Sequence, residues 1–310
     1  MRVCVLGAGG IVGRTLLKVL EERNFPVDDI ILFGTEEKEL ILEGKVFKIE
    51  KFRGKVPDCD IFFSCLEDEE AKEVVPEIVK RGKRVIDNSS AFRLEEGVPL
   101  VVPEVNKDHL KKSDLLIANP NCSTIQLVLS ISPFLRFGIK KIFVSTYQSV
   151  SGAGKKGLYA YQKEKRGEIL TNSPFPFKIF ENLFPYVGEI KDGESKEERK
   201  IFLESRKILK NDNLEIYATC VRVPVPYVHS QSVFVEFEKE VSLDELKDEI
   251  EKRSYLVYDE IPVPNRYIDK DVVGVGRIRV RKNVLSFFSC MDNLRKGAAT
   301  NAVQIGEFYV

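Results

Sequence analysis

Residues 3–20 read VCVLGAGGIVGRTLLKVL, and this stretch decides the fold class of the chain. The apolar run at 3–6 predicts a short buried strand. From Val12 to Leu20 the apolar residues recur at helical spacing, so we expect a helix to follow the strand after a glycine-rich turn. The stretch therefore predicts the first strand–turn–helix unit of an α/β fold.

The spaced glycines of this turn favour nucleotide binding. Gly7 allows the tight turn, Gly10 lets a pyrophosphate approach the backbone, and Gly13 lets the helix pack close to the sheet. Amides at the start of the helix would then face the diphosphate. The structural alternative is a glycine turn that merely opens an α/β domain, but the strand–helix context favours the nucleotide site.

Strands and helical patterns alternate through the first third of the chain, which predicts a parallel sheet with helices on both faces. Strands are expected at 29–33, 60–64, 84–87, 100–102 and 115–118, with a helix at 71–80. After about residue 121 the pattern changes. Strands at 141–148, 216–225, 231–238 and 284–291, with helices at 123–134 and 194–210, predict a mainly antiparallel sheet in a second domain.

The composition excludes several classes of function. The 310 residues include 48 Lys and Arg against 48 Asp and Glu, and this balance argues against nucleic-acid binding. No apolar run approaches the roughly 18 residues that indicate a membrane span. The six cysteines are scattered without a CxxC pair, and the two histidines belong to no Cys/His cluster, so no metal site is expected. We therefore expect a cytoplasmic enzyme with no nucleic-acid or membrane partner.

Residues 119–124, NPNCST, contain the candidate nucleophile. Pro120 disfavours helix at Asn119, and an apolar helix follows at once. Cys122 is therefore expected at a helix N-terminus, where the macrodipole favours the thiolate. A buried structural cysteine is the alternative, and the local sequence leaves both interpretations open.

A cysteine nucleophile needs a base, and the chain offers two histidines. His109 lies in a charged stretch that is typical of an exposed helix start. His229 lies between two expected strands, where a loop would present it, so it is the better candidate of the two by elimination. A satisfied structural histidine is the common alternative. Arg222, on the preceding strand, would direct a guanidinium toward a substrate carboxylate or else form a surface ion pair.

The end of the second strand leaves the choice of cofactor open. An acidic residue there would hold the adenosine ribose of NAD, whereas a cation would hold the 2′-phosphate of NADP. The chain reads Thr35-Glu36-Glu37-Lys38 at this point and so supplies both kinds of charge.

Taken together, these residues resemble the aspartate-β-semialdehyde dehydrogenase family over nearly the whole chain. The matching stretches are GAGGIVG at 7–13, VIDNSSAFR at 85–93, VPLVVPEVN at 98–106, NPNCSTIQ at 119–126, STYQSVSGAG at 145–154, TCVRVPV at 219–225, HSQSV at 229–233, VGRIR at 275–279 and DNLRKGAATNAVQI at 292–305. Several such segments in the same order are far more specific than any one of them.

The resemblance implies roles for the residues at matching positions. Cys122 would carry the acyl group, and His229 would be the general acid/base. Arg222 would bind the substrate α-carboxylate, with Glu198 near its amino group. The other substrate residues would be Arg93 and Lys200 at the phosphate, Asn121 beside the nucleophile and Gln148 beside the thioester. The cofactor residues would be Gly7, Gly9, Gly10, Ile11, Val12, Gly13, Thr35, Lys38, Ser64, Ser151, Gly152 and Asn293.

The resemblance also implies a fold and an activity. A Rossmann-type nucleotide-binding domain would span residues 1–121 and be joined by the C-terminal helix 293–310. An α+β catalytic and dimerisation domain with a mainly antiparallel sheet would span 122–292. The expected reaction is the reversible NADP-dependent reduction of L-aspartyl-4-phosphate to L-aspartate-4-semialdehyde and phosphate, in lysine, threonine and methionine biosynthesis. The expected partner is a second copy in a homodimer, with a homotetramer as the larger alternative.

Two other functions stay open on the sequence. One is an N-acetyl-glutamyl-phosphate reductase-like enzyme, which shares the architecture and the cysteine chemistry. The other is a non-catalytic paralogue that acts as a binding protein. The NPNCST motif and the spacing of Arg222 and His229 favour the aspartate enzyme, and a binding protein has no need of this set of reactive residues.

Three stretches depart from the family pattern. Relatives commonly carry a Ser-Arg-Ser sequence where this chain has 35–38, which weakens the expected NADP preference and makes NAD an alternative cofactor. Relatives have a Gly/Ser-rich loop where this chain reads CLEDE at 65–69, so only Ser64 is retained there as a site residue. In EERK at 197–200, a shift of one position would change which Glu and Lys are functional.

Overall fold

The computed structural model describes residues 1–42 and 44–310. The chain folds into two compact units, one formed by Met1–Asn121 with Ala298–Val310 and the other by Cys122–Gly297. The sequence predicts a nucleotide-binding domain at 1–121, joined by the helix at 293–310, and a catalytic and dimerisation domain at 122–292. These bounds and the roles of the two domains stay predictions. Within the described residues, no helix is both long and apolar enough to cross a membrane.

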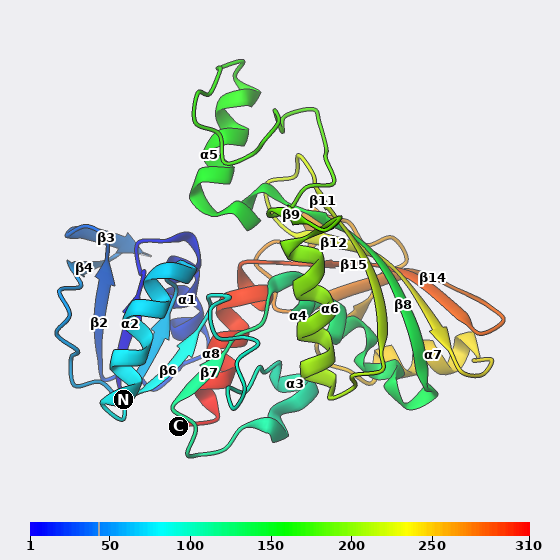
Figure 1. Ribbon diagram of the computed structural model, residues 1–310, viewed down its shortest axis with the longest axis horizontal. Coiled ribbons are helices and arrows are strands. Elements are labelled where there is room, and N and C mark those ends of the chain that lie inside the picture. The colour runs from blue at the N-terminus through cyan, green and yellow to red at the C-terminus, as the bar shows by residue number, and fades with distance from the viewer. Residues whose placement is uncertain (43) are drawn as a thin grey trace. The chain divides into compact units, whose positions relative to one another are not determined.

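The first unit is built on a seven-stranded sheet with strand order β3-β4-β2-β1-β5-β6-β7 (Figure 1). Its strands are β1 (Arg2–Leu6), β2 (Asp29–Gly34), β3 (Lys38–Leu42), β4 (Lys45–Lys51), β5 (Ile61–Ser64), β6 (Arg84–Asp87) and β7 (Leu116–Ala118). Neighbouring strands are parallel except for the edge pair β3–β4, which is antiparallel. The Rossmann-like parallel sheet is therefore confirmed.

Helices cover both faces of this sheet because its strands alternate two apolar sets. Val3 and Val5 of β1 share a core with the apolar faces of α1 (Ile11–Glu22) and α8 (Thr300–Glu307). Cys4 and Leu6 share the opposite core with α2 (Asp68–Lys80). The period-2 alternation of a strand produces this two-sided burial. The short helix α3 (Pro103–Asn106) and the 3₁₀ turn η1 (Lys107–His109) precede β7.

The second unit contains a six-stranded sheet with order β11-β8-β12-β15-β14-β13. Its strands are β8 (Ile139–Gln148), β11 (Glu215–Arg222), β12 (His229–Phe237), β13 (Leu256–Tyr258), β14 (Val273–Arg281) and β15 (Val284–Met291). The three central pairings are antiparallel and the two outer ones parallel. The sheet is thus mixed, with the expected antiparallel strands at its centre.

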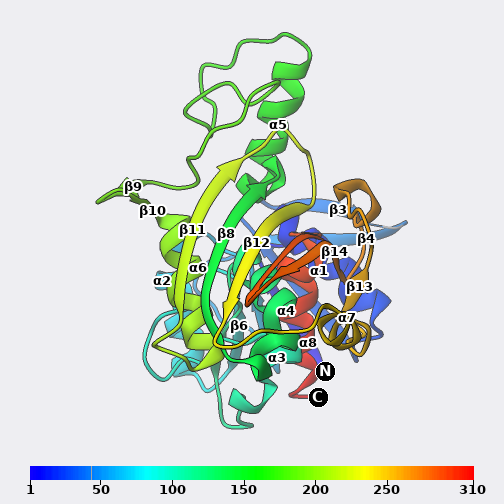
Figure 2. The same ribbon diagram turned by 90° about the vertical axis from the view of Figure 1, so that its right-hand side faces the viewer.

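One face of this sheet is covered by helices. α4 (Cys122–Ile131) packs against α6 (Lys196–Leu209) and against β14 and β15, and α6 packs against β11. Figure 2 shows β11, β8 and β12 side by side as one curved layer. The remaining elements are α5 (Gly154–Lys165), α7 (Leu243–Glu251), the hairpin β9 (Ile190–Lys191) and β10 (Glu194–Ser195), the 3₁₀ turns η2 (Ser132–Phe137), η3 (Val150–Ala153) and η4 (Pro264–Arg266), and the π-helical turn η5 (Arg295–Ala299).

Two expected segments differ in the structure. The strand expected at 100–102 is reduced to a single bridge between Leu100 and Ala118, because Pro103 starts α3 immediately afterwards. The stretch SVSGAG at 149–154, whose composition predicts a flexible loop, contains the 3₁₀ turn η3, in which Val150 and Ser151 are buried. This second difference matters because the turn holds residues of the candidate site.

Candidate active site

Cys122 is the first residue of α4, as the Asn-Pro sequence before it predicts. Its thiol is half-buried and forms no disulfide. The Cys122 side chain packs against Gly297. A Cβ at position 297 would lie 3.0 Å from the Cβ of Cys122, so a larger residue there would crowd the cysteine. The sulfur therefore stands at the positive end of a helix whose other residues are buried, a setting that stabilises a thiolate.

His229 is the first residue of β12 and has no solvent exposure. Its Nδ1 accepts from the backbone N–H of Ser149 at 3.1 Å and lies 2.9 Å from the Ser149 hydroxyl. Its Nε2 has no hydrogen-bond partner among the described residues. Burial, together with the positive charge of Arg222, lowers the pKa of His229 well below its usual 6.5.

Arg222 ends β11 opposite Gln148 on β8, and it is 6% exposed. Its Nη1 donates to the Ser149 carbonyl at 2.6 Å. Burial lowers the pKa of the guanidinium, and the negative charge of the Glu197 carboxylate opposes this shift. The attraction between the Arg222 cation and the Cys122 thiolate is mutual, so this arginine also supports an anionic sulfur.

Gln148, Glu197 and Lys200 form a polar group beside the arginine. Gln148 donates through Nε2 to Thr146 Oγ1 at 3.2 Å and to Glu197 Oε1 at 3.4 Å. Lys200 Nζ lies 3.5 Å from Glu197 Oε2, one helical turn away on α6. A carboxylate, an amide and an ammonium are thereby gathered on neighbouring elements, a set suited to an amino-acid substrate.

Glu198 is used differently from its neighbour. It is the N3 residue of α6, and its Oε2 accepts from the Ser195 backbone N–H at 2.8 Å in a capping box. Its Oε1 accepts from the backbone N–H of Cys220 at 2.8 Å. Both oxygens of Glu198 therefore stabilise the helix start and β11, whereas Glu197 faces Gln148 and Lys200.

Asn293 is buried and forms hydrogen bonds with residues around His229. Its Oδ1 accepts from the Ser151 hydroxyl and from the backbone N–H of Val228, both at 3.2 Å, and lies 3.1 Å from the Ser149 hydroxyl. Val228 has a φ of +71°, which costs a β-branched residue about 1–3 kcal/mol. The Asn293 bond helps to hold this strained residue, and through it the adjacent His229.

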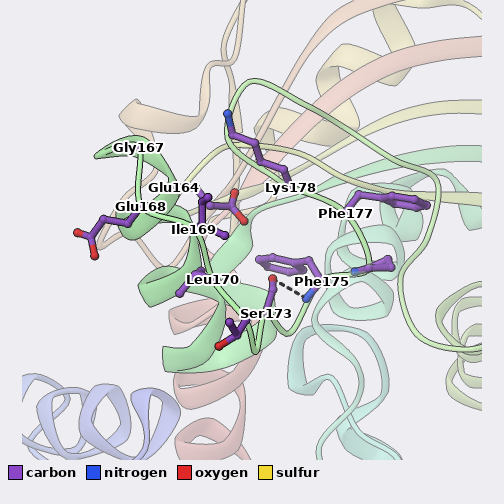
Figure 3. A pocket seen from close by; sticks show the side chains of 11 residues that line it. Glu164, Gly167, Glu168, Ile169, Leu170, Ser173, Phe175, Phe177 and Lys178 are labelled. Carbon is purple, nitrogen blue, oxygen red and sulfur yellow. Dashed lines mark hydrogen bonds between the residues drawn. The ribbon is translucent and has the colours of Figure 1, made fainter.

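A pocket of about 490 Å³ lies between the end of α5 and the loop at 167–178 that follows it (Figure 3). Glu164 ties the far end of the loop, because its Oε2 accepts from the backbone N–H groups of Ile179 and Phe180 at 2.8 and 2.9 Å. The ring of Phe175 lies 5.8 Å from the Arg222 guanidinium carbon. The pocket wall thus provides an apolar cover on one side of this arginine.

Within the first unit, the glycine turn has the form that a nucleotide site requires. Gly7 has a φ of +74°, and a Cβ there would lie 2.4 Å from the Cys65 carbonyl oxygen. A Cβ at Gly13 would lie 2.5 Å from the Gly7 carbonyl oxygen, so only glycine lets α1 pack this closely. α1 begins at Ile11 without a side-chain cap or an acidic first-turn residue among the described residues. Its amides therefore fit a diphosphate.

Charges beside this turn come from the segment after β2. A Cβ at Gly9 would lie 3.5 Å from Lys38 Nζ, so the Lys38 ammonium stands against the turn. Glu37 is engaged elsewhere, in an ion pair with Arg53 at 3.0 Å. Thr35 is exposed.

The other expected residues of the first unit are Ser64, Arg93 and Asn121, all of them buried. Ser64 ends β5, at the carboxyl edge of the parallel sheet. Arg93 is fixed by carbonyl groups, with Nε donating to Asn119 at 2.9 Å and Nη2 to Asn88 at 2.7 Å. Asn121 immediately precedes the candidate nucleophile.

The second unit brings eight of the expected site residues together: Cys122, Gln148, Ser151, Gly152, Lys200, Arg222, His229 and Asn293. Sequence reasoning missed Ser149, which bonds to both Arg222 and His229. The capping pattern Ser195-x-x-Glu198 was a signal in the sequence that separates Glu198 from Glu197. Among the described residues, no cluster of His, Cys, Asp or Glu could hold a metal ion.

Comparison with known proteins shows the family of the chain. Residues 2–113 match the family model of the semialdehyde dehydrogenase NAD binding domain, and residues 131–296 match that of the semialdehyde dehydrogenase dimerisation domain. These two matches define an oxidoreductase of the semialdehyde dehydrogenase class with a nucleotide-binding domain.

Individual relatives narrow the class. An aspartate-semialdehyde dehydrogenase of Aquifex aeolicus is 42% identical over 100% of this chain and 98% of its own, and one of Rickettsia conorii is 40% identical over 98% and 96%. The crystal structure of aspartate semialdehyde dehydrogenase II from Vibrio cholerae superposes with a TM-score of 0.93 at 36% identity, covering 99% of this chain and 97% of that one. The chain belongs to the aspartate-semialdehyde dehydrogenase family, and is an oxidoreductase of amino-acid biosynthesis.

Proposed function

We propose that the chain catalyses the reversible NADP-dependent reduction of L-aspartyl-4-phosphate to L-aspartate-4-semialdehyde and phosphate through a thioester on Cys122. The reaction would serve lysine, threonine and methionine biosynthesis in the cytoplasm. The observation that carries the proposal is the placement of Cys122 at the start of α4, in electrostatic contact with the buried Arg222. The Vibrio cholerae relative was also solved complexed with ASA, which supports the substrate class.

In the proposed mechanism the Cys122 thiolate attacks the acyl carbon of the aspartyl phosphate. A carbon–sulfur bond forms, and the carbon–oxygen bond to phosphate breaks with its electron pair leaving on phosphate. A bound nicotinamide supplies the hydride that reduces the thioester carbon. The carbon–sulfur bond then breaks, the aldehyde is released and the thiolate is restored. His229 is the general acid/base at the reacting oxygen.

The substrate is held by residues of complementary charge. Arg222 would pair with the α-carboxylate, where a planar guanidinium binds both oxygens. Gln148 would orient the acyl group, and Asn121 would stand beside the nucleophile. Arg93 and Lys200 would neutralise the phosphate, as the family resemblance implies.

For the substrate ammonium we propose Glu197 in place of Glu198, because both Glu198 oxygens already accept backbone N–H bonds. Glu197→Gln is expected to raise the KM for the semialdehyde by about 10- to 100-fold, the loss of one charge-assisted hydrogen bond. Glu198→Gln keeps a capping side chain and is expected to leave KM within about twofold. Steady-state kinetics of the two variants test this, and the opposite ranking would return the role to Glu198.

For the cofactor we propose NADP, with Lys38 at the 2′-phosphate and NAD as the alternative. The ammonium of Lys38 against Gly9 supports a phosphate at this position, and the ion pair of Glu37 with Arg53 directs one competing carboxylate away. The diphosphate would lie on Gly7, Gly9, Gly10, Ile11, Val12 and Gly13, with Thr35, Ser64, Ser151, Gly152 and Asn293 as the further cofactor residues.

The activity is tested by following cofactor reduction with L-aspartate-4-semialdehyde and phosphate, and in parallel with N-acetylglutamate semialdehyde and phosphate. Turnover of the aspartate compound, faster with NADP than with NAD, is the expected result. Activity confined to the N-acetylglutamate compound would overturn the proposed substrate. Comparable rates with both nucleotides would overturn only the NADP preference.

We further propose a homodimer through the exposed face of the six-stranded sheet. Phe143, Tyr217 and Phe234, on adjacent strands, are 44%, 53% and 44% exposed, and the first two stack at 5.2 Å between ring centroids. They line a hollow of about 280 Å³. The match to the dimerisation-domain model includes all three, which supports a second copy of the chain as the occupant.

A Phe143→Lys/Tyr217→Lys double variant is expected to shift the protein from dimer to monomer, because four buried charges would oppose pairing of the two sheets. Light scattering after size exclusion measures the mass and also separates a dimer from a tetramer. Val46→Lys on β4, where the side chain is 62% exposed, is the matched control and should leave the mass unchanged. A double variant that keeps the wild-type mass would place the interface elsewhere.

A further inference from the structure

Ser149 bonds to two of the charged or titratable groups of the candidate site, His229 and Arg222. Its backbone N–H donates to His229 Nδ1 at 3.1 Å, and its backbone carbonyl accepts from Arg222 Nη1 at 2.6 Å. Its hydroxyl lies 2.9 Å from the same Nδ1. Gln148 and Ser151 on either side of it belong to the expected site, but Ser149 itself was assigned no role.

The backbone bond decides which ring nitrogen carries the hydrogen. An amide N–H can only donate, so Nδ1 must offer its lone pair. A neutral imidazole that accepts at Nδ1 carries its hydrogen on Nε2. A proton on Nδ1 would point at the Ser149 N–H, so both the imidazolium and the other neutral tautomer are opposed.

The surroundings hold the ring in this state. The Ser149 hydroxyl also lies 2.9 Å from the Ser151 hydroxyl and 3.1 Å from Asn293 Oδ1, and in the proposed tautomer its single hydrogen points to Nδ1. A Cβ at Gly152 would lie 3.1 Å from both Cε1 and Nε2 of the ring, so the turn η3 closes over its edge. Arg222 is the charged group that acts on His229, and its positive charge further opposes a second proton on the ring.

We propose that Ser149 is a positioning residue that keeps the hydrogen of His229 on Nε2, so that His229 donates a hydrogen bond to the reacting carbonyl oxygen and does not deprotonate Cys122. This rests on the proposed function and, for the step in which the thioester forms, replaces the general acid/base role of His229 with hydrogen-bond donation. When the carbon–sulfur bond forms, the carbonyl electron pair moves onto oxygen, where Nε2–H stabilises it while keeping its proton. The pair returns as the bond to phosphate breaks.

The buried, unpartnered Nε2 supports this assignment. A buried polar nitrogen without a hydrogen-bond partner is costly, and such groups in native proteins commonly have a functional use. A substrate oxygen would satisfy it. The thiolate of Cys122 has its own support in the N-terminus of α4 and in the charge of Arg222, so it needs no proton transfer to His229.

The first test is ¹⁵N NMR of the full-length protein labelled at histidine. The chain has only two histidines, and His109→Gln assigns the signals of the other. At neutral pH we expect His229 to show a pyridine-type Nδ1 and a pyrrole-type Nε2. A pyrrole-type Nδ1, whether in the other neutral tautomer or in the imidazolium, would overturn the proposal. This measurement does not depend on turnover, so it can fail while the proposed function holds.

The second test asks whether His229 acts on the thiol. Alkylation of Cys122 by iodoacetamide, read by mass spectrometry at the Cys122 peptide, is measured against pH in wild type and His229→Asn. The proposal expects the two pH profiles to coincide. A profile displaced to higher pH in His229→Asn would show that the histidine is the base for the thiol and would overturn the donor role.

The third test separates positioning from general damage. Ser149→Ala keeps the backbone bonds and loses the hydroxyl, so we expect kcat to fall by about tenfold with KM within about twofold. Ser149→Thr should restore most of kcat. Ser130→Ala, which removes another fully buried hydroxyl bonded to a backbone carbonyl on α4, is the control and should leave kcat unchanged. Equal losses in Ser149→Ala and Ser130→Ala would reduce Ser149 to a structural role.

Discussion

Replacing Cys122 with alanine should abolish turnover while the protein still folds and binds its nucleotide. Removal of a covalent nucleophile commonly lowers kcat by roughly 10⁴-fold or more, because no other group can carry the acyl intermediate. The side chain is half-buried at the start of α4, and alanine there leaves the helix intact. Turnover, circular dichroism and nucleotide affinity are measured together.

The control is Cys59→Ala, which removes a buried thiol from the first unit and should leave turnover unchanged. Mass spectrometry after mixing wild type with aspartyl phosphate should find the acyl group on the Cys122 peptide and no adduct in Cys122→Ala. If Cys122→Ala kept more than about a hundredth of wild-type turnover, a thioester mechanism would be excluded.

The parts of the structure that the sequence predicts well are those determined by local chemistry. The strand–turn–helix from Val3 to Leu20 follows from apolar spacing and from glycines whose places no Cβ can take. Cys122 opens α4 because Pro120 disfavours helix before it. In both cases the decisive residues lie within one turn of the feature they determine.

Features that depend on tertiary partners could not be predicted in this way. The strand expected at 100–102 has a suitable apolar pattern, but it pairs only at Leu100. Ser149 is one serine among several in STYQSVSGAG. Its bonds to Arg222 and His229 exist only because β8 and β11 end, and β12 begins, at the same edge of the sheet. Val228 in the left-handed region has no sequence signal at all, since valine is among the residues least suited to it.

The change His229→Asn is expected to lower kcat by about a hundredfold and to change the KM for the semialdehyde little. Asparagine keeps a polar group of similar reach but cannot place a donor where Nε2–H stands. Because Arg222 is held by the Ser149 carbonyl and not by the histidine, substrate binding should survive. An unchanged kcat would remove His229 from the mechanism.

The same substitution should make folding less sensitive to acid. The pKa of His229 is far below 6.5 in the folded protein and ordinary in the unfolded chain. As pH falls below about 6.5, the unfolded chain therefore binds a proton that the folded protein refuses, and the wild type loses up to about 1.4 kcal/mol of unfolding free energy per pH unit. The asparagine side chain does not titrate in this range. The unfolding free energy of His229→Asn should therefore fall less steeply with decreasing pH than that of the wild type.

Urea unfolding between pH 7.5 and 5 measures the difference. The control is His109→Asn, because His109 lies in the first unit, where its Nδ1 is 3.0 Å from the Asn106 amide nitrogen. The unfolding free energy of the wild type and of the control should fall with pH at the same slope. The slope for His229→Asn should be smaller, by the amount that corresponds to about one bound proton. Parallel slopes in all three would mean that His229 takes up its proton in the folded state. The protonated ring would carry a hydrogen on both nitrogens. Nδ1 could then not accept the Ser149 N–H bond, and the proposed neutral tautomer with hydrogen on Nε2 would be wrong.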